Sequence, residues 1–153
     1  MNNQEIAQKN FDEFQKALNK DLIRCQEGEL HKDIIVFGDA PHGEPRVTYG
    51  LRGPGSRLKA SCVAVQNDPF KGKPCFDVGV VTFKKFRKQG HGKSILEKAI
   101  SELKNGLAKK GIEEFYVELK VDPENEASHK LCRPFADEII EKQDGTIYMR
   151  LVK

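Results

Sequence analysis

Apolar side chains recur at helical spacing in three segments of the chain. Residues 3–28 carry an apolar side chain every three to five positions, which predicts an amphipathic helix over 3–28 that stops at Gly28. A second apolar stripe predicts a helix that Gly111 closes, and a shorter helix is expected over 123–132, before Pro134. The stripe positions are Ile6, Phe11, Phe14, Leu18 and Leu22 in the first helix, and Ile95, Leu96, Ala99, Ile100, Leu103 and Leu107 in the second.

Short apolar runs between turn-forming residues predict the strands. The segment 67–74 lacks this pattern and is expected to be a loop. Asp144 and Gly145 separate two β-rich runs near the end of the chain, and Asp-Gly in that setting is a strong hairpin signal. No helix is expected between residues 32 and 75. The other predicted strands cover 32–39, 46–52, 58–66, 75–83 and 112–121.

The order of these elements predicts one α/β domain over residues 1–153. A helix, several strands, a helix, a strand, a helix and a hairpin follow one another without a linker or a repeat, and this order favours a mixed sheet with flanking helices. The length of 153 residues suits a single core.

The charge distribution bears on the choice of partner. The chain has 26 Lys and Arg against 23 Asp and Glu, a formal charge of +3, which is too small an excess to predict nucleic-acid binding. The positive charge is concentrated between residues 84 and 93, where it suits a small anionic ligand. These residues are Lys84, Lys85, Arg87, Lys88 and Lys93.

The cysteines and the chain start indicate the compartment. Cys25, Cys62, Cys75 and Cys132 form no C-x-x-C pair and match no zinc spacing, so we expect reduced thiols and no metal. The first residues are polar, and no run approaches the roughly 20 apolar residues that span a membrane. We therefore expect a cytoplasmic protein without a membrane partner.

The segment "FRKQGHGKS" (86–94) contains glycine, lysine and serine in the order that ends a nucleotide-binding P-loop. That motif needs its first glycine at position 87, where this chain has Arg87, so the P-loop interpretation fails. The pattern R-x-x-G-x-G over 87–92 fits better, because it lies between a strand and a helix, where free N–H groups bind a pyrophosphate. The alternative is a tight turn with a solvated basic rim.

Together with the elements around it, this motif resembles the GNAT superfamily of acyl-CoA-dependent N-acyltransferases. The segment 80–100 follows the family's Q/R-x-x-G-x-G/A loop and helix, and Asn125, Ala127, Ser128 and Leu131 follow its second motif. The closing hairpin also agrees, so the most family-like part is 75–152. The resemblance implies a GNAT-like domain with a mixed, mostly antiparallel sheet and a splayed strand pair at the cofactor site.

The resemblance also implies a cofactor site for acetyl-CoA. The family's loop cradles the pyrophosphate, and the strand before it pairs with the pantetheine arm and the acyl carbonyl. Asn125 matches a position that contacts the cofactor, although a helix N-terminal cap explains it equally well. The implied cofactor-binding residues are Val80, Val81, Thr82, Arg87, Lys88, Gln89, Gly90, His91, Gly92, Lys93 and Asn125.

The implied reaction is direct attack of a primary amine on the thioester, which benefits from a base and an acid. The family's acid is a tyrosine after the matching leucine, and this chain has Cys132 there, which is either a proton donor or a core residue. Glu118 is a candidate base, and Asp77 is a second one. Lys120 stands where some relatives have a glutamate. His91 and His129 are not expected to be catalytic, and His129 is expected to be solvated.

Departures from the family pattern leave the acceptor open. A long helix replaces the family's first strand, and Ala136-Asp137 replaces a Gly-Phe pair. The expected function is an N-acetyltransferase for a small amine, a peptide or a protein, acting as a monomer or homodimer. The alternative is a catalytically inactive CoA-binding sensor or interaction module.

Overall fold

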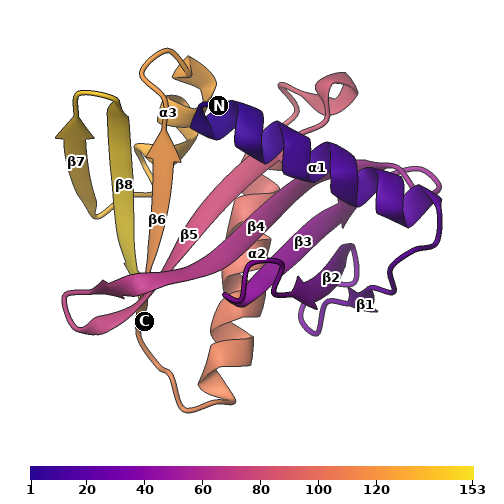
Figure 1. The fold of residues 1–153 in the computed structure, drawn as a ribbon, viewed down its shortest axis with the longest axis horizontal. Coiled ribbons are helices and arrows are strands. Elements are labelled where there is room, and N and C mark those ends of the chain that lie inside the picture. Colours follow the sequence, from indigo (N-terminus) through magenta and orange to yellow (C-terminus); the bar gives the residue numbers. More distant parts are fainter.

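The computed structural model describes residues 1–153 and contains one eight-stranded sheet with three α-helices (Figure 1). A short 3-10 helix, η1 (Lys84–Phe86), precedes α2. No helix is both long enough and apolar enough to cross a membrane. The helices are α1 (Asn3–Asn19), α2 (His91–Ala108) and α3 (Glu126–Cys132); the strands are β1 (Gln26–Glu27), β2 (Ile34–Asp39), β3 (Arg46–Arg52), β4 (Leu58–Phe70), β5 (Lys73–Thr82), β6 (Phe115–Val121), β7 (Glu138–Lys142) and β8 (Gly145–Val152).

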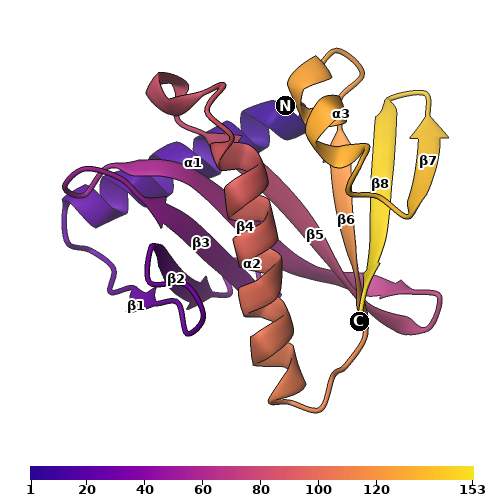
Figure 2. The same ribbon diagram turned by 180° about the vertical axis from the view of Figure 1, so that it is seen from behind.

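The sheet order is β1-β2-β3-β4-β5-β6-β8-β7, and only β5 and β6 run parallel. Three residue pairs join these two strands, and the last is Asp77 with Glu118. Beyond that pair the strands separate, although β5 continues to Thr82 and β6 to Val121. This separation is the predicted splay, and it opens a split in the middle of the sheet (Figures 1 and 2).

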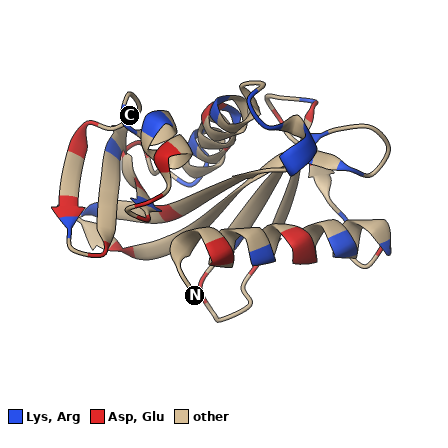
Figure 3. Ribbon diagram, turned by 90° about the horizontal axis from the view of Figure 1, so that it is seen from above, with Lys and Arg blue, Asp and Glu red and all other residues tan.

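The helices lie on opposite faces of the sheet. Helices α2 and α3 cover one face and α1 covers the other, as the view from above shows (Figure 3). The main core lies under α2, where Ile95, Leu96 and Ala99 pack against the inward positions of the strands. Because strand side chains alternate, the other positions of β5 and β6 face α1. The predicted mixed α/β sheet with flanking helices is therefore confirmed.

The first helix is shorter than the predicted 3–28. It ends at Asn19, because Asp21 adopts a left-handed conformation (φ 54°) and the N–H of Leu22 reaches back to the carbonyl of Ala17 at 2.9 Å. Leu22 continues the apolar spacing but is 71% exposed. The apolar spacing therefore extends past the helix, and Gly28 lies beyond β1 instead of at a helix end.

The expected loop over 67–74 is largely strand. Strand β4 continues to Phe70 and β5 begins at Lys73, so only Lys71 and Gly72 form the turn, both with positive φ. Phe70 packs edge-on against Tyr116, with 4.8 Å between ring centroids, and this contact holds the extended hairpin against the sheet. The predicted strand over 46–52, the closing hairpin and the absence of a helix between 32 and 75 are confirmed.

Candidate functional site

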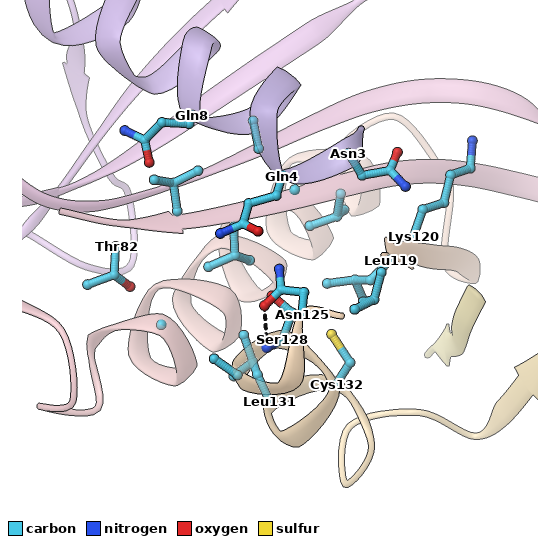
Figure 4. Close-up of a pocket in the computed structure, with 18 of the residues that line it drawn as sticks. Asn3, Gln4, Gln8, Thr82, Leu119, Lys120, Asn125, Ser128, Leu131 and Cys132 are labelled. Carbon is cyan, nitrogen blue, oxygen red and sulfur yellow. Dashed lines mark hydrogen bonds between the residues drawn. The ribbon is translucent and has the colours of Figure 1, made fainter. Parts of the chain in front are cut away.

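A cavity of about 810 Å³ occupies the split between β5 and β6. Its walls come from the separated ends of both strands, the first half of α1, the start of α2, and α3. In the close-up, Lys120 and Asn3 lie at one end of the cavity and Thr82 at the other, with Asn125 between them (Figure 4). The cavity therefore extends from the glycine loop to the point where the strands separate.

The glycine loop presents unpaired backbone donors at one end of this cavity. Gly90 is the N-cap of α2, with φ 81°, and Lys88 is also left-handed, with φ 61°. The six N–H groups from Lys88 to Lys93 have no acceptor within the protein, since the first helical bond is from Ser94 N to Gly90 O. Such a run of N–H groups at a helix start is an anion-binding arrangement.

Most of the predicted loop residues line the cavity. Arg87, Lys88, Gly90, His91 and Gly92 do so, and Arg87 Nε is 3.3 Å from the carbonyl oxygen of Thr82. The side chains of Gln89 and Lys93 are not part of the lining, and Gln89 donates to the carbonyl of Lys85 at 3.4 Å.

The strand residues Val80, Val81 and Thr82 also line the cavity. On one side they pair with β4, from Thr82 with Ala60 to Val80 with Cys62. On the other side β6 has moved away, so the backbone edge of β5 borders the split instead of another strand.

Asn125 is the helix cap that one sequence interpretation predicted, and its contact with a cofactor stays a prediction. Its Oδ1 accepts from Ser128 N at 3.2 Å, so the residue is the N-cap of α3. Its side chain also lines the cavity, and its Nδ2 donates to no protein group.

The candidate acid Cys132 lines the cavity with 1% of its surface exposed. Burial raises the pKa of this thiol to about 12. It therefore stays protonated at neutral pH, but it is a weaker acid than a free thiol, whose pKa is about 8.5.

The candidate base Glu118 is held outside the cavity lining. Asn67 Nδ2 donates to its Oε1 at 2.5 Å. Asp77, the second candidate, does line the cavity, directly at the point where β5 and β6 separate. Burial raises the pKa of Asp77, and the nearby Lys120 ammonium partly opposes this rise.

Lys120 lies between the two carboxylates. Its Nζ is 3.5 Å from Asp77 Oδ2 and 3.8 Å from Glu118 Oε1. Asp77, Glu118 and Lys120 thus form one ionisable cluster at the closed end of the split, although they come from two strands more than 40 positions apart.

Helix α1 completes the cavity on the far face of the sheet, with Asn3, Gln4 and Gln8 in the lining. The carboxylate of Asp122, 4% exposed, accepts from Asn3 N at 3.2 Å, Asn3 Nδ2 at 3.0 Å and Gln4 N at 3.0 Å. Sequence reasoning missed these residues, because no local motif links residues 3–8 to residue 122.

His129 is not the solvated residue that its helix position suggested. Its Nε2 is 3.0 Å from the carbonyl oxygen of Asp122 and its Nδ1 is 2.6 Å from Tyr148 Oη. A carbonyl only accepts, so Nε2 donates, and in the neutral ring Nδ1 accepts from the tyrosine hydroxyl. His129 therefore ties α3 to β6 and β8.

Comparison with known proteins agrees with this architecture. The model of the acetyltransferase (GNAT) family matches residues 12–136, and the chain belongs to this family. The match starts within α1 and includes the glycine loop and Asn125. A search of curated proteins found no match.

Solved structures share the fold. A GNAT-family acetyltransferase from Streptococcus pneumoniae aligns with a TM-score of 0.55 and 17% identity, over 71% of this chain and 67% of that one. A proposed ribosomal-protein-serine acetyltransferase from Vibrio cholerae aligns with a TM-score of 0.53 and 16% identity, over 71% of this chain. The present chain spans 64% of the length of the Vibrio protein.

Proposed function

We propose that this protein is an N-acetyltransferase that transfers an acetyl group from acetyl-CoA to a primary amine by direct attack. The observation that carries this proposal is that one cavity joins an anion-binding loop to an ionisable cluster across a split sheet. The family is one of acyl-CoA-dependent transferases. The acceptor is a small molecule or a peptide, and the Vibrio neighbour, which is named for a ribosomal protein, illustrates the second class.

The residues present fit a CoA-type co-substrate. The unpaired N–H groups of residues 88–93 suit a pyrophosphate, and the Arg87 and Lys88 side chains supply positive charge beside them. The exposed edge of β5 from Val80 to Thr82 offers backbone groups to an extended arm. A backbone N–H of this edge that meets the thioester oxygen stabilises the oxyanion that forms during attack. Acetyl-CoA supplies the activated acetyl group.

A proton acceptor is needed because amines are protonated at neutral pH and only the free base attacks. The geometry favours Asp77, which lines the cavity and makes no hydrogen bond within the protein, over Glu118, which Asn67 holds outside it. We therefore assign proton acceptance to Asp77, and the role of Glu118 stays a prediction. Cys132, with its pKa of about 12, is at best a weak donor to the leaving thiolate.

Calorimetry and a thiol-release assay test this function. We expect coenzyme A and acetyl-CoA to bind to the purified protein, and Gly90→Glu to abolish binding, because a carboxylate at the N-cap of α2 repels a pyrophosphate. We expect Asp77→Asn to lower kcat/KM by a factor of about 100 or more and Glu118→Gln to have a much smaller effect. Absence of coenzyme A binding would refute the proposal.

A CoA-binding protein without catalysis is the second candidate. The observation in its favour is that Cys132, buried with a raised pKa, stands where the family has its acidic tyrosine. Tight acetyl-CoA binding without thiol release over a broad amine panel would establish this alternative. Transfer to any amine that Gly90→Glu abolishes would exclude it.

A further inference from the structure

Two side chains of opposite charge lie at the end of the cavity away from the glycine loop, which we call the acceptor end. Asp77 and Lys120 both line the cavity, and their charged atoms lie 3.5 Å apart. This distance exceeds that of a well-formed charge-assisted hydrogen bond. Neither side chain makes a hydrogen bond elsewhere in the protein, although the Lys120 ammonium also lies 3.8 Å from Glu118 Oε1. Each side chain is about 40% exposed, so both can take a ligand.

The remaining walls near this pair are close to neutral. Asn3, Gln4 and Gln8 of α1 contribute amides, and β4 contributes Ser61, Val63 and Val65. The carboxylate of Asp122 also belongs to the lining, but the N-terminal N–H groups of α1 occupy it. The basic residues Arg87 and Lys88 belong to the glycine loop at the other end. Glu126 and Lys130 of α3 also line the cavity, but both border a second pocket as well. Glu118 lies 3.8 Å from the Lys120 ammonium but outside the lining. Among the lining residues of β5 and β6, therefore, Asp77 and Lys120 are the pair that supplies charge next to the split.

We propose that the acceptor is a small zwitterion that carries an amino group and a carboxylate on the same or adjacent carbon atoms, as an α-amino acid does. The inference rests on the proposed function and names the acceptor class for that site. Asp77 binds the ammonium of the acceptor, and Lys120 binds its carboxylate. Each protein charge then exchanges a long, partly solvated contact for a direct charge-assisted one.

The same pair of charges disfavours other amines. A simple amine that binds Asp77 leaves the Lys120 ammonium beside a second positive charge, and like charges at this distance repel. An amino-acid amide or a peptide N-terminus offers Lys120 a neutral carbonyl instead of a carboxylate. Recognition of a carboxylate by one positioned cation is the kind of contact that rejects an analogue lacking it.

The transfer step balances with the groups present. The acceptor ammonium gives a proton to Asp77, and the freed nitrogen attacks the thioester carbonyl. The C–N bond forms and the C–S bond breaks. The nitrogen then gives up its second proton, and the leaving thiolate takes up a proton in its place, so that free coenzyme A departs as the thiol. The products are an N-acetyl amino acid, free coenzyme A and the proton released from Asp77 to solvent.

The test compares kcat/KM for each amino acid with its own amide, and adds simple amines and C-terminally blocked peptides. We expect the zwitterion to exceed its amide by about tenfold or more in the wild type. Lys120→Gln should remove this preference. Lys73→Gln is the matched control, because Lys73 is also ion-paired, is exposed to a similar degree (37% against 40%) and lies outside the cavity.

Lys120→Gln also has an effect that a purely structural role for Lys120 does not predict. The Lys120 ammonium lowers the pKa of Asp77, so its removal should shift the acid limb of the rate profile to higher pH. Lys120→Arg, which keeps the charge, should retain the preference for a carboxylate. A zwitterion preference that persists in Lys120→Gln would overturn the inference.

The remaining outcomes separate this inference from the proposed function. If amides, simple amines or blocked peptides react as well as amino acids, the acceptor inference is wrong and the transferase function stands. If acetyl-CoA does not bind at all, the proposed function fails first. If acetyl-CoA binds without turnover, a thermal-shift measurement with amino acids tests the acceptor inference. Amino acids should raise the Tm of the acetyl-CoA-bound wild type but not that of Lys120→Gln, and equal shifts in both proteins would contradict the inference.

Discussion

At the residue scale, strand alternation and local pairing decide which carboxylate serves the cavity. Asp77 and Glu118 are neighbours in the last β5–β6 pair, yet only Asp77 lines the split. Glu118 is tied to Asn67, whereas Asp77 has only the long contact with Lys120. A half-buried carboxylate that has so few polar contacts lowers the free energy of unfolding. Such costs are expected where a side chain serves function.

This cost predicts how Asp77→Asn changes stability with pH. Burial raises the pKa of Asp77, so the folded protein keeps its proton to a higher pH than the unfolded chain, where the pKa is about 3.9. The wild type therefore loses free energy of unfolding as pH rises through this range. The asparagine variant should not show this loss. Urea unfolding measures the free energy of unfolding of both proteins at pH 4 and pH 7. The difference, variant minus wild type, should be more positive at pH 7 than at pH 4. A more negative difference at pH 7 would contradict a raised pKa of Asp77.

Gly90 gives a second prediction at this scale. Its φ of 81° is left-handed, so Gly90→Ala should cost about 1 kcal/mol of unfolding free energy, although no atom lies within 4 Å of the added Cβ. Gly106 lies inside α2 with equally free space and no positive φ. Gly106→Ala should therefore stabilise by roughly 0.5–1 kcal/mol.

The same two variants separate stability from binding. Gly90→Ala should weaken coenzyme A binding, because a change in its backbone angles moves the neighbouring N–H groups of the loop. Gly106→Ala should leave binding unchanged. Calorimetry on both variants checks this, and equal affinities would show that the loop conformation does not matter for the ligand.

At the element scale, the function depends on how α1 is held over the split. Residues of β5 and α1 approach closely: a Cβ added at Gly79 would lie 3.9 Å from the Cβ of Ala7. At its start, α1 is fixed by the Asp122 carboxylate at the end of β6. A negative charge is favourable at a helix N-terminus, and burial strengthens the contact. This carboxylate thus links the helix to the strand that carries Lys120.

Asp122→Asn should loosen α1 as a unit. An amide keeps one acceptor oxygen but directs an NH2 group at backbone donors, so we expect a loss of about 1–2 kcal/mol. Hydrogen exchange should accelerate along α1, and KM for the acceptor should rise because the helix lines its end of the cavity. Asn2→Ala, which removes only the exposed cap to Glu5 N, is the control and should leave KM unchanged. Unaltered exchange in Asp122→Asn would show that α1 is held by other contacts.

The elements also show what the sequence can and cannot predict. Strand β3 matches its predicted bounds, because β-rich residues and flanking glycines define it locally. The end of α1 was missed, because Leu22 continues the apolar spacing after the helix has stopped. The glycine loop was found because its chemistry lies in consecutive residues. The Asp77–Lys120 pair and the Asp122 anchor depend on which strands separate and which helix covers them, and no local pattern records that.

At the scale of the whole molecule, the sheet consists of two parts that the split separates. Strands β1–β5 form one part and β6, β8 and β7 the other, with three residue pairs between them. Much of the remaining connection is the core beneath α2, to which both parts contribute. A ligand in the cavity touches residues of both parts, so its binding energy should add directly to the stability of their association.

Acetyl-CoA should therefore stabilise the protein and rigidify the split. At about 100 times its dissociation constant, a ligand specific for the folded state adds about 2.7 kcal/mol, which corresponds to a rise in Tm of roughly 5–10 °C for a chain of this size. Hydrogen exchange should slow most in residues 78–82 and 119–121, where β5 and β6 border the cavity without pairing with each other. Gly90→Glu should show neither effect. ATP should give a much smaller shift, because Arg87 replaces the first glycine of a P-loop. An equal shift with ATP would mean that the loop recognises phosphates in general, and that the split does not select for the longer co-substrate.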